Sequence, residues 1–169
     1  TGPGLLTVGR STIRDTHNYG QLTVSQVIEK SSNVGAARIA LALSGRGLRE
    51  MFTKAGFGAI TGISLPGEVA GRMNPPSGIP IEIATLGYGY GISVTPLQLA
   101  RAYSVLANGG RILPVSLLRR DVQGRTSAAG AGSAGAADTL PEGERVMSEQ
   151  TARQVRGMLE QAVSQDGTG

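Results

Sequence analysis

The sequence contains no cysteine and no tryptophan, and only 4% of its 169 residues are aromatic. The absence of cysteine excludes disulfide bonds, thiol nucleophiles and cysteine-based metal sites. With so few aromatic rings, the core has to be built from Leu, Ile, Val and Ala, and a chain of this length can form one such domain. No apolar run approaches the roughly 18 residues of a membrane-spanning helix, and no signal peptide opens the chain.

Lysine is also scarce, because Lys30 and Lys54 are the only two, so arginine supplies most of the positive charge behind the formal net charge of +4. The arginines are scattered and form no stripe, which argues against a nucleic-acid groove. We expect no nucleic-acid partner, no cofactor and no metal. The chain opens on Thr1 without a methionine, and we expect it to be an excised or processed piece of a longer protein.

Glycine, in contrast, is abundant with 26 residues, which indicates many turns and close backbone contacts. Thr23 with Gln26, and Thr95 with Gln98, form capping boxes that predict helices over residues 24–30 and 96–108. The other expected elements are strands over 5–8, 11–14 and 112–122, a buried helix over 34–43 capped by Asn33, a helix over 48–55, a helical turn over 81–86, and a helix over 149–164 capped by Ser148.

Two stretches predict loops. Residues 57–80 are rich in Gly and Pro, which interrupt regular structure. Residues 127–137 are almost wholly Ala, Gly and Ser and cannot bury enough apolar surface to offset their ordering entropy. We therefore expect a flexible Ala/Gly-rich loop over 123–145 within a single partial domain that spans 1–169.

The candidate site is the short polar segment Ser31-Ser32-Asn33, which lies between two expected helices. One interpretation is a helix end followed by a helix cap, where Ser and Asn are favoured for backbone reasons. The other is functional: the Ser31 hydroxyl would pass a proton to or from a leaving group, and the Asn33 carboxamide would hold a substrate amide. The residues alone leave both interpretations open.

The segment Lys30-Ser31-Ser32-Asn33-Val34-Gly35 resembles the second active-site box of penicillin-binding proteins, and the resemblance extends over most of the chain. The other similar segments are residues 13–20, 22–24, 61–68, 88–100, 107–110 and 166–169. Their details are similar to class B enzymes of the septal, division-specific type (penicillin-binding protein 3). Elongation-type relatives usually carry Cys and Asp where this chain has Ser32 and Asn33.

The resemblance implies an α+β fold of the penicilloyl-serine transferase type, the β-lactamase and transpeptidase-like fold. This chain would form mainly its helical lobe with an incomplete sheet. The family set comprises S-x-x-K, an S-x-N box and K-T-G. No serine here is followed by lysine three residues later, and no K-T-G is present. We expect the nucleophile box upstream of Thr1 and the K-T-G box downstream of Gly169, so that the chain alone would be inactive.

For the whole enzyme, the resemblance implies a D,D-transpeptidase that cross-links stem peptides ending in D-Ala-D-Ala during septum synthesis and is acylated by β-lactams. It implies catalytic roles for Ser31 and Asn33. Tyr88 and Tyr90 would line the substrate cleft, although packing in the core explains them equally well. The implied location is the periplasmic face of the bacterial inner membrane, with an anchoring N-terminal helix outside this chain and division membrane proteins as partners.

Two rival functions are considered beside the transpeptidase. The first is a non-catalytic interaction module that docks on division proteins or anionic wall polymers, which the positive charge and the missing nucleophile favour. The second is a serine β-lactamase, which needs the same missing lysine and a water-activating base. We also expect apolar surface left exposed by the incomplete sheet to favour dimerisation or segment exchange.

Overall fold

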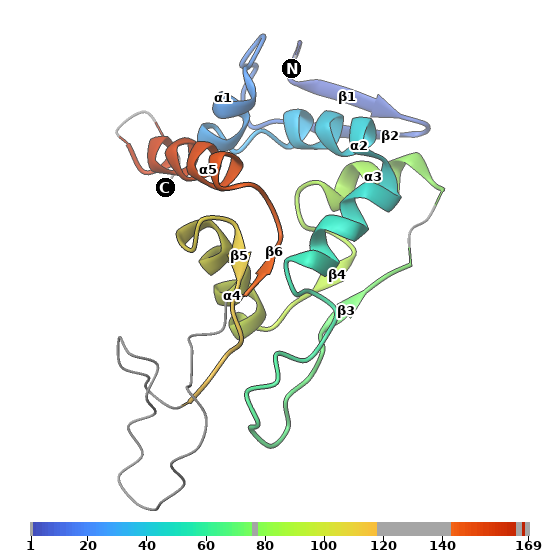
Figure 1. Cartoon of the computed structure of the whole chain (residues 1–169). Helices are drawn as coiled ribbons and strands as arrows, with labels where there is room; N and C mark the ends of the chain where they lie inside the picture. Colours follow the sequence, from blue (N-terminus) through green and yellow to red (C-terminus); the bar gives the residue numbers. More distant parts are fainter. Residues whose placement is uncertain (1, 76–77, 118–142, 165–166, 168–169) are drawn as a thin grey trace, which may run out of the picture.

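A β-hairpin begins the chain in the computed structural model, which describes residues 2–75, 78–117, 143–164 and 167 (Figure 1). Strands β1 (Leu5–Val8) and β2 (Ser11–Arg14) pair antiparallel, with Leu5 opposite Arg14 and Val8 opposite Ser11. Gly9 has a φ of 61°, which the tight turn between the strands requires. Both strands lie where the sequence predicts them.

Helices form most of the other described elements, and three of them begin at caps that the sequence predicts. They are α1 (Val24–Glu29), α2 (Asn33–Lys54), α3 (Pro80–Leu86), α4 (Pro96–Ala107) and α5 (Glu149–Ala162). Thr23 and Thr95 complete capping boxes with the glutamines that follow them, and the Ser148 hydroxyl accepts the amide N–H of Thr151. Local side-chain chemistry therefore sets the starts of α1, α4 and α5.

Helix α2 joins two helices that the sequence predicts separately, and it is interrupted at the predicted break. Ser44, inside it, has a φ of 68° and a ψ of 158°, which are not helical. The expected cap is wrong by one position: Ser32 is the N-cap and Asn33 is the first helical residue. The reason is that the Ser32 hydroxyl, and not the Asn33 carboxamide, accepts the amide N–H of Gly35, at 2.9 Å.

Short two-stranded ribbons connect the helices in the described part of the chain. Strand β3 (Arg72–Met73) pairs with β4 (Ile92–Ser93), and β5 (Arg111–Ile112) pairs with β6 (Glu144–Arg145), both antiparallel. The predicted strand over 112–122 is wrong in extent, because the strand ends at Ile112 and 118–122 lie outside the described residues. Strand β3 falls in a stretch expected to be loop.

The expected flexible loop over 123–145 lies outside the described residues as far as position 142, and its last two residues form β6.

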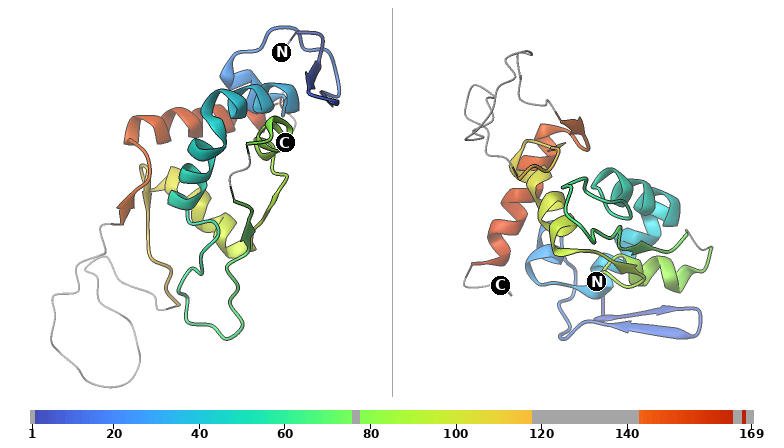
Figure 2. Two further views of the ribbon diagram at one scale, coloured as in Figure 1. Left: turned by 90° about the vertical axis from the view of Figure 1, so that its right-hand side faces the viewer. Right: turned by 90° about the horizontal axis from the view of Figure 1, so that it is seen from below.

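The core lies around the first half of α2, as its small residues predict. Val8 and Ile13 from the hairpin pack with Val34 and Ala37 of α2 and with Ala84 of α3. A second cluster joins Val105, Ile112 and Val146 where α4 meets β5 and β6. Helix α5 lies between α1 and α4, which both contact it, and the views in Figure 1 and Figure 2 show it beside them. The end of α1 and the start of α2 are thereby supported from several sides.

Among the residues that the structure describes, no helix combines the length and the apolar character needed to cross a bilayer.

Candidate functional site

The candidate site is the turn that joins α1 to α2. Helix α1 ends at its C-cap Lys30, and α2 starts at its N-cap Ser32, so Ser31 is the one residue between the two caps. The Ser31 N–H donates to the carbonyl of Ile28 at 3.2 Å, and the Ser32 N–H donates to the carbonyl of Val27 at 3.0 Å. These two bonds close the last turn of α1 directly onto the candidate residues.

Ser31 has a φ of 49°, in the left-handed region that residues with a side chain rarely adopt. Its side chain is exposed, whereas that of the next residue, Ser32, is buried. Backbone strain of this kind persists where the surrounding structure fixes it, and it gathers at functional sites. Ser31 therefore combines an exposed side chain with a strained backbone.

Asn33 stands half-buried on the first turn of α2. Its Nδ2 lies 3.5 Å from the carbonyl oxygen of Arg14, at the outer limit of a hydrogen bond. This contact of the carboxamide is therefore weak. Ser31 and Asn33 thus lie together, two positions apart, at the start of one helix.

Ser32, in the same segment, has a structural role. Its side chain is only 2% exposed, and its hydroxyl donates to a carboxylate oxygen of Asp15 at 2.7 Å. The other carboxylate oxygen of Asp15 accepts the Val34 N–H at 2.9 Å. The structural interpretation of the polar segment, a helix cap, therefore holds for Ser32, whereas Ser31 is exposed and Asn33 is half-buried.

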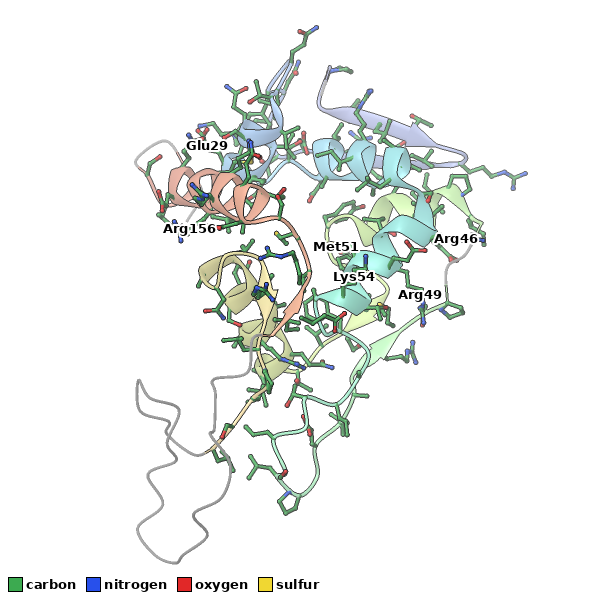
Figure 3. The ribbon with its side chains drawn as sticks, in the orientation of Figure 1. Glu29, Arg46, Arg49, Met51, Lys54 and Arg156 are labelled. Atoms are coloured by element: carbon green, nitrogen blue, oxygen red, sulfur yellow. The ribbon has the colours of Figure 1, made fainter. Side chains whose placement is uncertain are left out.

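Charged and polar groups of α1 lie beside this turn. The Lys30 ammonium pairs with the Glu29 carboxylate at 2.9 Å, and the Ser25 hydroxyl donates to Gln161 of α5 at 2.5 Å. Figure 3 shows Glu29 and Arg156 on the neighbouring helices α1 and α5. Helix α1, which precedes Ser31, is thus joined to α5 through its first turn.

Tyr88 and Tyr90 have different surroundings, although their rings contact each other edge-on with centroids 5.6 Å apart. Tyr88 is half-buried and packs against the core cluster of α2, α3 and the hairpin. Burial, together with the nearby Tyr90, raises the pKa of the Tyr88 hydroxyl above its ordinary value. Tyr90 is 67% exposed. Packing in the core accounts for Tyr88, but it does not account for Tyr90.

Tyr90 lines a cavity of about 270 Å³ between the second half of α2, the segment after β3, and α3. The other lining residues are Gly45, Arg49, Met73, Asn74, Pro75, Glu82, Ile83, Thr85, Leu86 and Gly91. Ser31 and Asn33 do not line it. Figure 3 shows Arg49 on the half of α2 that lies away from Glu29 and α1. The structure therefore brings Ser31 and Asn33 together but places Tyr90 at a separate hollow.

The residue that sequence reasoning missed is Asp15. It follows β2 directly and lies in the segment 13–20, which resembles the family, but the sequence pattern assigns it no role. The available signal was a single acidic residue at the end of a strand, which is too common to indicate a contact with a serine 17 positions away. Only the fold brings the two together.

Comparison with known proteins matches residues 5–169 to the family described as the penicillin binding protein transpeptidase domain. The probable peptidoglycan D,D-transpeptidase PenA of Neisseria meningitidis is 35% identical over 163 residues, which cover 96% of this chain and 25% of PenA. The peptidoglycan D,D-transpeptidase FtsI of Escherichia coli is 35% identical over 158 residues, which cover 93% of this chain and 24% of FtsI. The chain thus spans about a quarter of the length of these relatives.

Solved structures agree with these matches. The TP domain of penicillin-binding protein 3 from Burkholderia pseudomallei superposes with a TM-score of 0.85 at 38% identity, over 99% of this chain and 46% of that one. A peptidoglycan glycosyltransferase from Burkholderia ambifaria gives the same TM-score and identity, over 99% of this chain and 49% of that one. The expected α+β fold of the penicilloyl-serine transferase type is confirmed.

Proposed function

The chain belongs to the penicillin-binding protein transpeptidase domain family, and from this premise we propose that it is the central part of a serine D,D-transpeptidase that cross-links peptidoglycan stem peptides. The observation that carries the proposal is the turn between α1 and α2. It presents an exposed serine hydroxyl in a strained conformation beside a weakly bonded carboxamide. A positioned hydroxyl can transfer a proton and a positioned carboxamide can donate a hydrogen bond, and acyl transfer at a serine uses groups of both kinds.

The reacting serine comes from outside this stretch, because no serine of the chain has a lysine three residues later. That serine adds to the carbonyl of the penultimate D-alanine, and the bond to the terminal D-alanine breaks. The Ser31 hydroxyl relays the proton that the leaving amine takes up. The Asn33 carboxamide holds the donor-peptide amide in place. The amine of a second stem peptide then attacks the acyl-enzyme ester and releases the serine.

The cellular role, the inhibitors, the location and the partners proposed for the enzyme follow from its resemblance to the family. The Ser32-Asn33 ending of the box supports a septal role rather than an elongation role, since elongation-type relatives usually carry Cys and Asp there. β-Lactams would acylate the same serine, since they mimic the D-Ala-D-Ala end. The enzyme would act on the periplasmic face of the inner membrane with division proteins as partners. The 169-residue chain alone would be inert and prone to self-association, since it leaves large apolar side chains such as Leu43 and Tyr103 exposed.

Acylation of the full-length protein by a fluorescent penicillin tests the proposal. The wild type should form a stable label, and Ser31→Ala and Asn33→Ala should each slow labelling by roughly 100-fold or more. Ser148→Ala is the control for a serine hydroxyl lost at a helix start away from this turn: it removes the N-cap of α5 and should leave the rate unchanged. An unlabelled wild type, a Ser31→Ala variant with the wild-type rate, or stable labelling of the isolated chain would contradict the proposal.

A further inference from the structure

The cavity between the second half of α2, the segment after β3, and α3 has no role in the proposed reaction. Its walls are fixed by contacts within the protein. Helix α3 packs against α2, and one nitrogen of the Arg49 guanidinium, Nη1, donates to the carbonyl of Met73 at 3.2 Å and to that of Asn74. The segment after β3 is thereby tied to α2, so the cavity is formed before any ligand enters, as is usual for small-molecule sites.

Arg49 keeps hydrogen-bond donors that the fold does not use. The residue is half-buried and lines the cavity. Among the residues that the structure describes, nothing accepts a hydrogen bond from its Nε or Nη2, and no carboxylate pairs with it. These two nitrogens form a side of the guanidinium that can bind both oxygens of a carboxylate at once. A half-buried arginine with this side unused is suited to a carboxylate from outside the chain.

Glu82 brings the opposite charge to the same cavity. It belongs to α3, lines the cavity and is exposed. Within the described part of the chain its carboxylate accepts no hydrogen bond and forms no ion pair, either with Arg49 or with another cation. One cavity thus presents a positive and a negative group that do not neutralise each other through direct contact. A ligand that carries both charges can pair with both groups.

An apolar wall completes the cavity. It consists of Met73, Ile83 and Leu86, which are half-buried, and of the exposed ring of Tyr90. The volume of about 270 Å³ is at the small end for ligand sites, which span roughly 300–1,000 Å³. The cavity therefore fits a small molecule with an apolar part, and it is too small for a folded segment or a polymer strand.

From this geometry we propose that the cavity is a second binding site, for a small amino-carboxylate with an apolar side chain, such as a free amino acid. The carboxylate of the ligand binds Nε and Nη2 of Arg49, its ammonium group pairs with Glu82, and its side chain packs on the apolar wall. The inference goes beyond the proposed transpeptidase function and does not rest on it, because Ser31 and Asn33 do not line the cavity.

Ligand-detected NMR titrations of the full-length protein test the site. L- and D-phenylalanine carry both charges, N-acetylphenylalanine lacks the ammonium group, and phenylalaninamide lacks the carboxylate. We expect at least one enantiomer of phenylalanine to bind saturably. The two analogues of the same hand should bind at least roughly 10-fold more weakly, since each has lost one charge-assisted contact. Binding of phenylalanine should persist after penicillin has acylated the protein, because the cavity is separate from the candidate site.

Three variants assign the contacts. Arg49→Gln should weaken phenylalanine binding by roughly 10-fold or more. Arg46→Gln is the matched control: it makes the same change of charge on the same helix, at an exposed residue that does not line the cavity, and should leave binding unchanged (Figure 3). Because Arg49 also holds the segment after β3, Glu82→Gln is the decisive variant. It should weaken the binding of phenylalanine but not that of N-acetylphenylalanine, which has no ammonium group to pair.

The inference is overturned if neither enantiomer binds, if an analogue binds as tightly as phenylalanine, or if Glu82→Gln leaves the binding of phenylalanine unchanged. Loss of binding after acylation would also overturn it, because the probe would then occupy the catalytic cleft. A wild type that penicillin does not label would instead refute the proposed function. The titrations of the unlabelled protein would still decide whether the cavity binds amino acids.

Discussion

Gly87 lies against the backbone of α2 at Ala36, so closely that a Cβ added at Gly87 would stand 2.7 Å from the Ala36 carbonyl oxygen. The same Cβ would stand 2.7 Å from the Cβ of Ala40. Gly87 is the C-cap of α3 and has a φ of −60°, which any residue adopts, so the contact alone demands glycine. The approach lets α3 rest on the small side chains of α2 and places Tyr88 against the core.

Gly87→Ala should therefore lower the free energy of unfolding by about 1–3 kcal/mol, because a methyl group is forced against helix backbone that cannot move away. Urea denaturation measures the change. Gly157→Ala is the matched control: Gly157 lies inside α5 with nothing within 4 Å of the added Cβ. That variant should gain roughly 0.5–1 kcal/mol, since alanine is the better helix former. A Gly87→Ala variant as stable as the wild type would contradict the packing described for α2 and α3.

The elements that local chemistry determines could be predicted from the sequence. The capping boxes at Thr23 and Thr95 each need only a residue three positions later, and both helices begin there. The sequence predicts separate helices over 34–43 and 48–55, and Ser44, which lies between these ranges, is the residue with non-helical angles. The small residues of α2 predicted a close neighbour, and Gly87 is that neighbour.

Contacts between distant segments could not be predicted from the sequence. The pairing of β3 with β4 joins segments of two residues each, too short to show any periodic pattern. The cap of α2 was placed on Asn33 rather than Ser32, because either residue type suits an N-cap and the choice depends on Asp15. The presence of Ser31 and Asn33 at one turn was predicted, but the carboxylate that holds the turn was not.

Glu68 should make the loop over residues 61–68 sensitive to acid. Its carboxylate accepts the Thr61 hydroxyl at 2.5 Å, the Thr61 N–H at 2.6 Å and the Gly62 N–H at 3.2 Å. The Thr61 hydroxyl, and then the loop amides, lower the pKa of Glu68 below its ordinary value of 4.5. A lowered carboxyl pKa stabilises the folded loop above the ordinary value, and this stability is lost as the pH falls through the folded-state pKa.

Amide hydrogen exchange at Thr61 and Gly62 measures this loss. Protection should be constant above the ordinary pKa of 4.5 and should fall at more acidic pH, after correction for the intrinsic exchange rate. Thr61→Val removes the hydroxyl donor and should return the pKa of Glu68 toward its ordinary value, which shifts the transition to higher pH. Glu68→Gln should abolish it. A transition that is the same in the wild type and in Thr61→Val would show that the Thr61 hydroxyl does not set the pKa.

Ser44 carries a strain that glycine should relieve. Its φ of 68° and ψ of 158° fall in a region that is nearly exclusive to glycine and costs other residues about 1–3 kcal/mol. Its hydroxyl accepts the Gly47 N–H at only 3.4 Å, so little is lost with it. Ser44→Gly should raise the free energy of unfolding by about 1 kcal/mol, as measured by urea denaturation. Ser44→Ala, which keeps the strain, should be no more stable than the wild type.

Ser31 is also strained, but here glycine should separate stability from activity. Ser31→Gly relieves the left-handed conformation, which costs about 1–2 kcal/mol for residues with a Cβ, and removes the hydroxyl that the proposed reaction uses. The variant should therefore melt at or above the wild-type temperature and yet be acylated by penicillin as slowly as Ser31→Ala. Ser44→Gly, which relieves a similar strain away from the turn, should keep the wild-type rate. If Ser31→Gly were acylated at the wild-type rate, the Ser31 hydroxyl would have no part in the reaction, and the proposed role of Ser31 would be wrong.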